Sequence, residues 1–155
     1  MVTARPKHSE GDWFAVPLRT GGYAVGLIAR ANPDGILVGY FFGPRRDALP
    51  PLAELAELHS DKACVLLRFG DLGLVRGTWP LLGKLDDWDR SAWPMPVFGR
   101  FEELTGRSYA VHYSNDDPSL LCREIEVAQD EISRSPSNDL YGAGAVEVAL
   151  TRLLG

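Results

Sequence analysis

The sequence predicts an α+β fold: a strongly coiled, mainly antiparallel sheet that could close into a barrel, with one short helix and one C-terminal helix. Three observations carry this prediction. Short stretches alternate apolar with polar residues, turn formers are frequent at 16 Gly and 11 Pro, and helical periodicity is confined to short segments. We expect about six to eight strands.

The beginning of the chain predicts an antiparallel meander. Its strands span Asp12–Leu18, Tyr23–Ala31 and Ile36–Gly43. Turn sequences rich in Gly, Pro and Asn separate them, at Arg19–Gly22 and Asn32–Gly35. Because glycine weakens a flat strand, the glycines inside the second and third strands indicate a bulge or sharp coiling, at Gly26 and Gly39.

The middle of the chain predicts a helix, a strand and a loop. Leucines recur every third residue over Leu52–Leu58 with glutamates between them, which is typical of a short amphipathic helix. Lys62–Phe69 has the alternation of a strand. The irregular stretch Asp86–Pro96, which holds two tryptophans and three acids, is expected to be a loop.

The last part of the chain predicts a hairpin, a strand and a helix. Val97–Phe101 and Tyr109–Tyr113 flank the turn at Thr105–Gly106 and form the hairpin. Leu120–Ala128 alternates and is expected to be a strand. The C-terminal helix is expected to start at about Asp139 or Ala143 and to end at Leu153.

No repeat, linker or change of composition divides the 155 residues, so we expect a single domain over 1–155, with a frayed N-terminus at 1–10. The residues expected in its core are Phe14, Val16, Val25, Ile28, Phe41, Leu67 and Val111.

The charge balance limits the classes of partner that we expect the chain to bind. The chain has 16 basic and 21 acidic residues, a formal net charge of −5. An acidic surface repels phosphate groups, so we expect neither nucleic acid nor membrane as a partner. The two cysteines, Cys64 and Cys122, lie in apolar stretches and are expected to be buried free thiols. Without a leader or a long apolar run, the sequence indicates a cytoplasmic protein.

Motifs for catalysis are weak. The three histidines lack metal-ligand spacing, so no metal or cofactor is expected. Cys122 with His112, or one of the adjacent carboxylate pairs, leaves open a small hydrolase or transferase. A β-barrel adaptor for a peptide or ligand is the other alternative.

Two groups of residues are candidates for contacting a protein partner. The first, in one loop, is Asp86, Asp87, Trp88 and Asp89, since aromatic side chains among charges are typical interface anchors. Trp88 has equal reason to be exposed or to pack over the sheet, whereas Trp93 is expected to be buried. Glu124 and Glu126 occupy alternate positions of one strand and share a face.

The order of short segments resembles the immunity protein 26 family of bacterial polymorphic-toxin systems. The segments are Gly11-Asp-Trp-Phe-Ala-Val-Pro-Leu18, Gly22-Tyr-Ala-Val-Gly26, Trp79-Pro-Leu-Leu-Gly83, Trp93-Pro-Met-Pro-Val-Phe98 and Tyr141-Gly to Ala145-Val-Glu147. The resemblance implies no active-site residue. It implies an antidote that binds a cognate toxin domain and neutralises it by stoichiometric occlusion, without enzymatic activity and with an oligomeric state that stays open.

Overall fold

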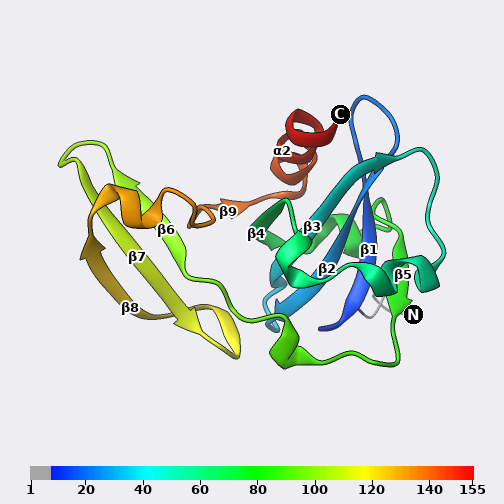
Figure 1. Ribbon diagram of the computed structural model, residues 1–155, viewed down its shortest axis with the longest axis horizontal. Helices are drawn as coiled ribbons and strands as arrows, with labels where there is room; N and C mark the ends of the chain where they lie inside the picture. Colours follow the sequence, from blue (N-terminus) through cyan, green and yellow to red (C-terminus); the bar gives the residue numbers. More distant parts are fainter. Residues whose placement is uncertain (1–7) are drawn as a thin grey trace, which may run out of the picture.

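The computed structural model describes residues 8–155, which form two mainly antiparallel sheets with short helices beside them (Figure 1). The predicted α+β class with mainly antiparallel strands is therefore confirmed. The six-stranded sheet has the order β5-β1-β2-β3-β4-β9, and its strands are β1 Asp12–Pro17, β2 Tyr23–Ala31, β3 Ile36–Arg46, β4 Val65–Gly70, β5 Leu81–Lys84 and β9 Leu140–Tyr141. The three-stranded sheet contains β6 Phe98–Glu102, β7 Arg107–Ser114 and β8 Asp117–Val127.

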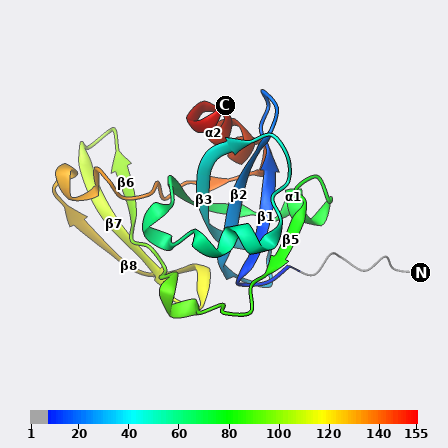
Figure 2. The same cartoon turned by 45° about the vertical axis from the view of Figure 1, so that its right-hand side comes forward.

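The larger sheet stays open, with β5 and β9 as its two edges. The strands thus divide between two sheets where one sheet was expected. The physical reason lies in the connection after β5, where residues 85–97 carry the chain away before the β6–β7–β8 hairpins form. Figure 2 shows the smaller sheet set to one side of the larger sheet.

The two expected helices are present, but the first is a 3₁₀ helix and further short helical segments accompany them. The segment expected as an amphipathic helix is the 3₁₀ helix η1, Leu52–Glu57. The C-terminal helix α2 spans Ala143–Leu154, so the later of the two expected starts is correct. Further short helices follow strands or sit in loops: η2 Ser60–Lys62, α1 Leu72–Val75, η3 Arg90–Ala92 and η4 Gln129–Ile132.

The glycines inside β2 and β3 make room for aromatic rings. A Cβ atom on Gly26 would lie 2.6 Å from the Phe14 ring, and one on Gly39 would lie 2.8 Å from the Phe69 ring. The register between β2 and β3 does shift, but between Ile28 and Arg30 and near Tyr23. Close packing of rings against bare backbone is therefore the main role of both glycines.

Apolar side chains cover both faces of the larger sheet. Directly opposed residues of neighbouring strands share a face of the sheet. Phe14 and Phe41 both oppose Gly26 and pack with helix α2 on one face. Trp13, Leu27 and Tyr40 oppose one another across three strands and lie on the other face. The expected core is confirmed, because each predicted residue is at most 2% exposed: Phe14, Val16, Val25, Ile28, Phe41, Leu67 and Val111.

Two buried arginines join the sheets. Arg30 on β2 is 2% exposed, and its guanidinium donates to the carbonyl oxygens of Asn115 (2.8 Å) and Trp93 (3.0 Å). Burial lowers the pKa of Arg30. Arg68 on β4 donates to the carbonyl oxygens of Pro118 and Asn138, at 3.0 and 2.8 Å. Each arginine thus ties a central strand to the β7–β8 region, beside a small apolar contact of Val38 with Phe98 and Val111.

The expected fraying of residues 1–10 concerns residues 1–7, which lie outside the described part of the chain. Within residues 8–10, the structure pairs His8 with Asp71 at 3.0 Å and Glu10 with Arg90 at 2.6 Å. Across residues 8–155, no helix has both the length and the apolar character to cross a membrane.

Candidate binding pocket beside the acidic loop

The acidic loop, residues 85–93, connects β5 to the smaller sheet and carries the first group of predicted contact residues. Its backbone turns at Leu85, whose carbonyl accepts from the Trp88 amide at 3.2 Å. Asp89 then caps η3, accepting from the amide and the hydroxyl of Ser91 at 3.0 and 2.7 Å. These hydrogen bonds from Ser91 lower the pKa of Asp89, so its carboxylate keeps its charge in more acidic solution.

The far end of the acidic loop is fixed by contacts from three directions. Arg90 pairs with Glu10 at 2.6 Å and with Asp116 at 3.1 Å. Hydrogen bonds from Arg30 to the Trp93 carbonyl and from the Tyr40 hydroxyl to the Pro94 carbonyl (2.5 Å) hold the following residues against the larger sheet. The loop therefore has a defined position, although its tip is exposed.

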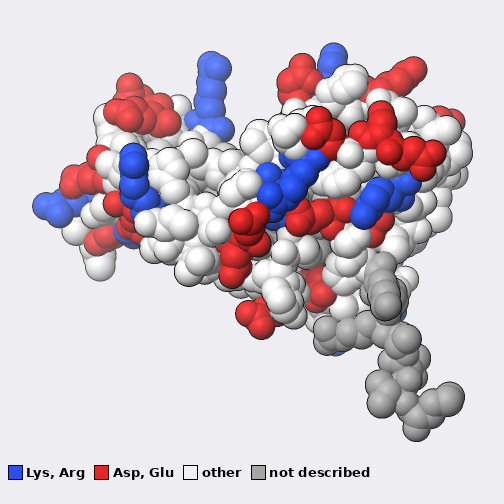
Figure 3. Space-filling model, turned by 90° about the horizontal axis from the view of Figure 1, so that it is seen from below, with Lys and Arg blue, Asp and Glu red and all other residues white. Residues whose placement is uncertain are grey.

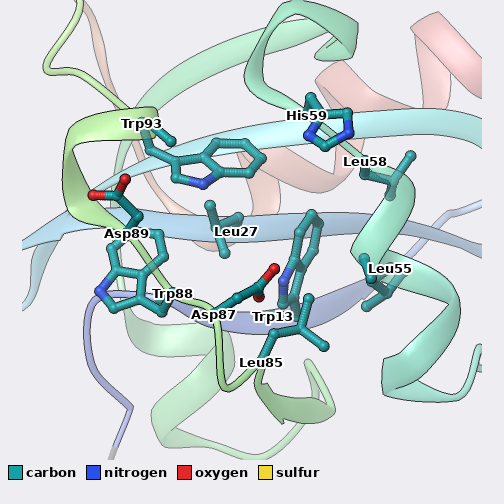
Figure 4. Close-up of a pocket in the computed structure, with 13 residues that line it drawn as sticks. Trp13, Leu27, Leu55, Leu58, His59, Leu85, Asp87, Trp88, Asp89 and Trp93 are labelled. Carbon is teal, nitrogen blue, oxygen red and sulfur yellow. The ribbon is translucent and has the colours of Figure 1, made fainter.

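A pocket of about 120 Å³ opens between the acidic loop and the end of η1 (Figure 4). Its floor is the surface of β1 and β2, at the buried side chains of Trp13 and Leu27. One wall carries Leu55, Leu58 and His59. The opposite wall belongs to the acidic loop, through Leu85, Asp87, Trp88, Asp89 and Trp93.

Three indole rings contribute to this pocket. The rings of Trp13 and Trp93 meet edge to face, with centroids 5.9 Å apart. Trp93 is 8% exposed, which confirms its predicted burial, and Trp88 is half-buried. The Trp88 ring lies against the backbone of Gly11, where a Cβ atom would come within 2.6 Å of it. Gly11 also has φ +91°, so glycine is required there on both counts.

The carboxylates of the acidic loop stand at the solvent side of the pocket. Asp87 and Asp89 are exposed and line it, whereas Asp86 is exposed and does not line it. Among residues 8–155, no ion pair involves Asp86, Asp87 or Asp89. Over the wider face, acidic and basic side chains are interspersed (Figure 3).

The second group of predicted contact residues lies on the other sheet. Glu124 and Glu126 face the same side of β8, opposite Val111 and Tyr109 of β7. Arg100 donates to Glu124, and Arg107 lies 3.7 Å from Glu126. The structure therefore does not bring the two groups into one site, and arginines offset the charge of the second group.

Both cysteines are exposed, so the prediction of buried thiols is wrong. Cys64 lies in the link between η2 and β4, and its thiol donates to the Phe41 carbonyl at 3.3 Å. Cys122 lies on β8, an edge strand, at a bulge: Arg123 opposes His112 and Leu121 opposes Tyr113, which leaves Cys122 without a place in the ladder. Cys122 is exposed because β8 is an edge strand, and Cys64 is exposed because it lies in a connection between elements, although both have apolar neighbours in the sequence.

The geometry gives little support to the alternative of a small hydrolase or transferase. His112 and Cys122 do lie on paired strands, but the residue opposite His112 is Arg123. Within the described residues, no group of three or more His, Cys, Asp or Glu side chains is placed to hold a metal ion.

Sequence reasoning missed half of the pocket. The leucine spacing over 52–58 predicted an apolar face without indicating that Leu55, Leu58 and His59 would stand opposite the acidic loop. Trp13 lies in the predicted strand Asp12–Leu18, but its place in the floor depends on pairing between β1 and β2. The two buried arginines also escaped notice, although Arg30 and Arg68 interrupt otherwise apolar strands and could have been recognised there.

Comparison with protein families gives one match. A family model described as Immunity protein 26 matches residues 9–110, which is more than half of the chain and includes all residues that line the pocket. Glu124, Glu126 and the similar segment at residues 141–147 lie outside the matched range. Comparisons with curated proteins and with solved structures found no match.

Proposed function

This chain belongs to the immunity protein 26 family, and from that premise we propose that it binds a cognate bacterial toxin domain and neutralises it by one-to-one occlusion. The family match over residues 9–110 is the observation that carries the proposal. Such a protein acts by binding in the cytoplasm as part of a polymorphic-toxin system and needs no catalytic centre of its own.

The proposed contact surface is centred on the acidic loop. Asp86, Asp87, Trp88 and Asp89 combine exposed charge with a half-buried indole on a loop that ion pairs hold in place. A preorganised loop loses little conformational entropy on binding, which favours affinity. Glu124 and Glu126 are a second proposed contact region, with a smaller contribution because Arg100 and Arg107 already pair with them.

Charge gives this proposal modest support. The net charge of −5 would attract a basic toxin domain and raise the association rate at low ionic strength. Because exposed charges are screened by salt, this contribution should fall as the salt concentration rises.

Co-expression tests the proposal. The chain is expressed with the C-terminal domain of the toxin encoded beside it, cell survival is scored, and the purified pair is titrated by calorimetry at low and high salt. We expect rescue of growth and one-to-one binding that weakens at high salt. Toxicity that persists at full expression of this chain, together with no heat of binding, would contradict the proposed function for that pair.

A variant locates the surface. Replacing Asp86, Asp87 and Asp89 together with Ala should weaken toxin binding about tenfold or more, because three exposed charges are lost from one loop. The matched control replaces Asp34, Asp47 and Asp130, which are exposed on other segments, with Ala and removes the same total charge. Equal weakening by the two variants would indicate general electrostatic attraction and would remove the acidic loop as the contact surface.

A further inference from the structure

The pocket beside the acidic loop combines two kinds of surface within one small volume. Its interior consists of indole rings and leucine side chains, with Trp13 and Leu27 at the floor. Its solvent side carries the carboxylates of Asp87 and Asp89. Among residues 8–155, no lysine or arginine lines it, and His59 contributes an imidazole to the wall opposite the acidic loop. The pocket is thus apolar within and negative at its opening.

We propose that this pocket receives one basic side chain, arginine or lysine, from the toxin domain. The inference rests on the proposed function for the identity of the partner, while the chemistry of the pocket is argued from its own residues. The volume of about 120 Å³ suits a single side chain and excludes a helix or a folded segment.

The aromatic walls favour a cation with an apolar stem. The face of an indole carries negative electrostatic potential, and tryptophan is the strongest of the aromatic residues in attracting cations. Lysine and arginine also carry long methylene stems, which can lie between the apolar walls while the charged end, which enters first, reaches the indole rings and the Asp87 carboxylate of the same pocket. One side chain of either kind would therefore satisfy both surfaces of the pocket.

The carboxylates discriminate against other side chains. A neutral apolar side chain would bring Asp87 and Asp89 out of water without an opposite charge, which costs free energy. An acidic side chain would add repulsion. A guanidinium or ammonium group instead gains charge-assisted hydrogen bonds to the same carboxylates.

The arrangement is already formed without a partner. Hydrogen bonds from Ser91 orient the Asp89 carboxylate, and Gly11 fixes the position of the Trp88 ring by allowing it to lie on the backbone. A binding site whose walls are in place before binding loses little affinity to reorganisation.

Single substitutions test the pocket in the toxin complex. Asp87→Asn and Asp89→Asn keep size and hydrogen-bonding capacity but remove the charge, and each should weaken calorimetric binding about tenfold. Asp86→Asn is the matched control, since Asp86 has the same charge on the same loop but does not line the pocket. We expect it to weaken binding no more than about threefold. Equal effects of all three substitutions would overturn the proposal.

The indole is tested separately. Trp88→Leu keeps apolar bulk and removes the aromatic face, and it should weaken binding roughly 3- to 30-fold. Thermal unfolding of the variant shows whether the fold is retained. If Trp88→Leu does not fold, the two Asp→Asn variants decide the outcome.

A toxin-free measurement keeps this inference distinct from the proposed function. Butylguanidinium and butylammonium salts are titrated into the whole chain, with neutral butylurea as control, and the indole N–H signals are followed by NMR. We expect both cations to shift the indole signals of the pocket tryptophans and butylurea to shift them far less. Equal shifts from all three probes would overturn the inference. Cation-specific shifts in a chain that fails to bind the toxin would overturn only the proposed partner.

The combined outcomes separate the two proposals. One outcome is that the chain binds the toxin one to one and that the variants Asp86→Asn, Asp87→Asn and Asp89→Asn bind it with the same affinity. This outcome would support the proposed function and rule out the cation pocket. Where Asp87→Asn and Asp89→Asn weaken binding instead, exchange of surface lysines and arginines of the toxin for Gln, one at a time, identifies the inserted residue. A single toxin residue whose loss is not additive with Asp87→Asn would support the pocket, whereas additivity for every residue would contradict it.

Discussion

The larger sheet buries apolar side chains on both of its faces, whereas the three-stranded sheet buries its apolar residues mainly on one. In the larger sheet, neighbouring residues Trp13 and Phe14 belong to different buried clusters. In the smaller sheet, Phe98 and Val111 are buried together, but most of β8 is exposed. The larger sheet is thus stabilised by packing, and the smaller one depends more on hydrogen bonds from Arg30 and Arg68.

The largest effect should follow from removing a ring in the larger sheet. Phe14 is fully buried and stacks on Trp79 with ring centroids 5.9 Å apart. Phe14→Ala should lower the free energy of unfolding by about 3–5 kcal/mol, because it leaves a cavity that the sheet cannot close. Phe101→Ala on β6, where the ring is 46% exposed, should cost less than about 1 kcal/mol. Chemical denaturation measures both, and similar losses would contradict the division between the sheets.

A smaller and more local effect should follow from Arg68→Met. The substitution leaves the carbonyl oxygens of Pro118 and Asn138 without their donor, which should cost about 2–3 kcal/mol. Amide hydrogen exchange should become faster in β8 while β2 keeps its protection. Arg123→Met, on the exposed side of β8, is the control and should leave exchange unchanged. Uniform loss of protection in both sheets would show that the smaller sheet does not open separately.

The smallest expected effect is a difference in labelling rate between the two cysteines, of which Cys64 lies just before β4 of the larger sheet and Cys122 lies on β8 of the smaller sheet. Although Cys64 is an exposed residue, its thiol is partly buried at the Phe41 carbonyl, and this desolvation raises the pKa of the Cys64 thiol, so less of the reactive thiolate is present at a given pH. We expect iodoacetamide at pH 8 to label exposed Cys122 before Cys64, and Cys64 labelling to require more alkaline solution. Mass spectrometry of native protein, with denatured protein as control, measures both rates. Faster labelling of Cys64 would contradict this order, and unusually fast labelling of Cys122 in mildly acidic solution would revive the thiol-enzyme alternative.

Local patterns predicted the larger sheet well, since its meander depends on turn sequences and on alternation that a single chain displays. The hairpin of β6 and β7 and the start of α2 at Ala143 were accessible for the same reason. The separation into two sheets could not be predicted from the sequence, because it depends on pairing between strands that are far apart in the sequence. Cys122 illustrates the limit: an apolar neighbourhood predicts burial, but an edge strand and a bulge expose the residue.

In the candidate site, too, the sequence predicted the features that depend on local composition and missed those that depend on tertiary structure. The composition of residues 86–89 indicated the acidic loop directly, and Trp93 was correctly expected to be buried. The wall from η1 and the floor from β1 came only with the tertiary structure. The pairing of Glu124 with Arg100 likewise depends on strand register, because the two residues are far apart in sequence.

One carbonyl group links the acidic loop mechanically to the smaller sheet. The oxygen of Asn115, at the turn between β7 and β8, accepts hydrogen bonds from both Arg30 and Arg90, each at 2.8 Å. Arg30 also holds the Trp93 carbonyl, while Arg90 belongs to the acidic loop itself. A force that displaces the turn is therefore transmitted to the acidic loop at Arg90 and at Trp93, and a load placed on the loop pulls on the turn.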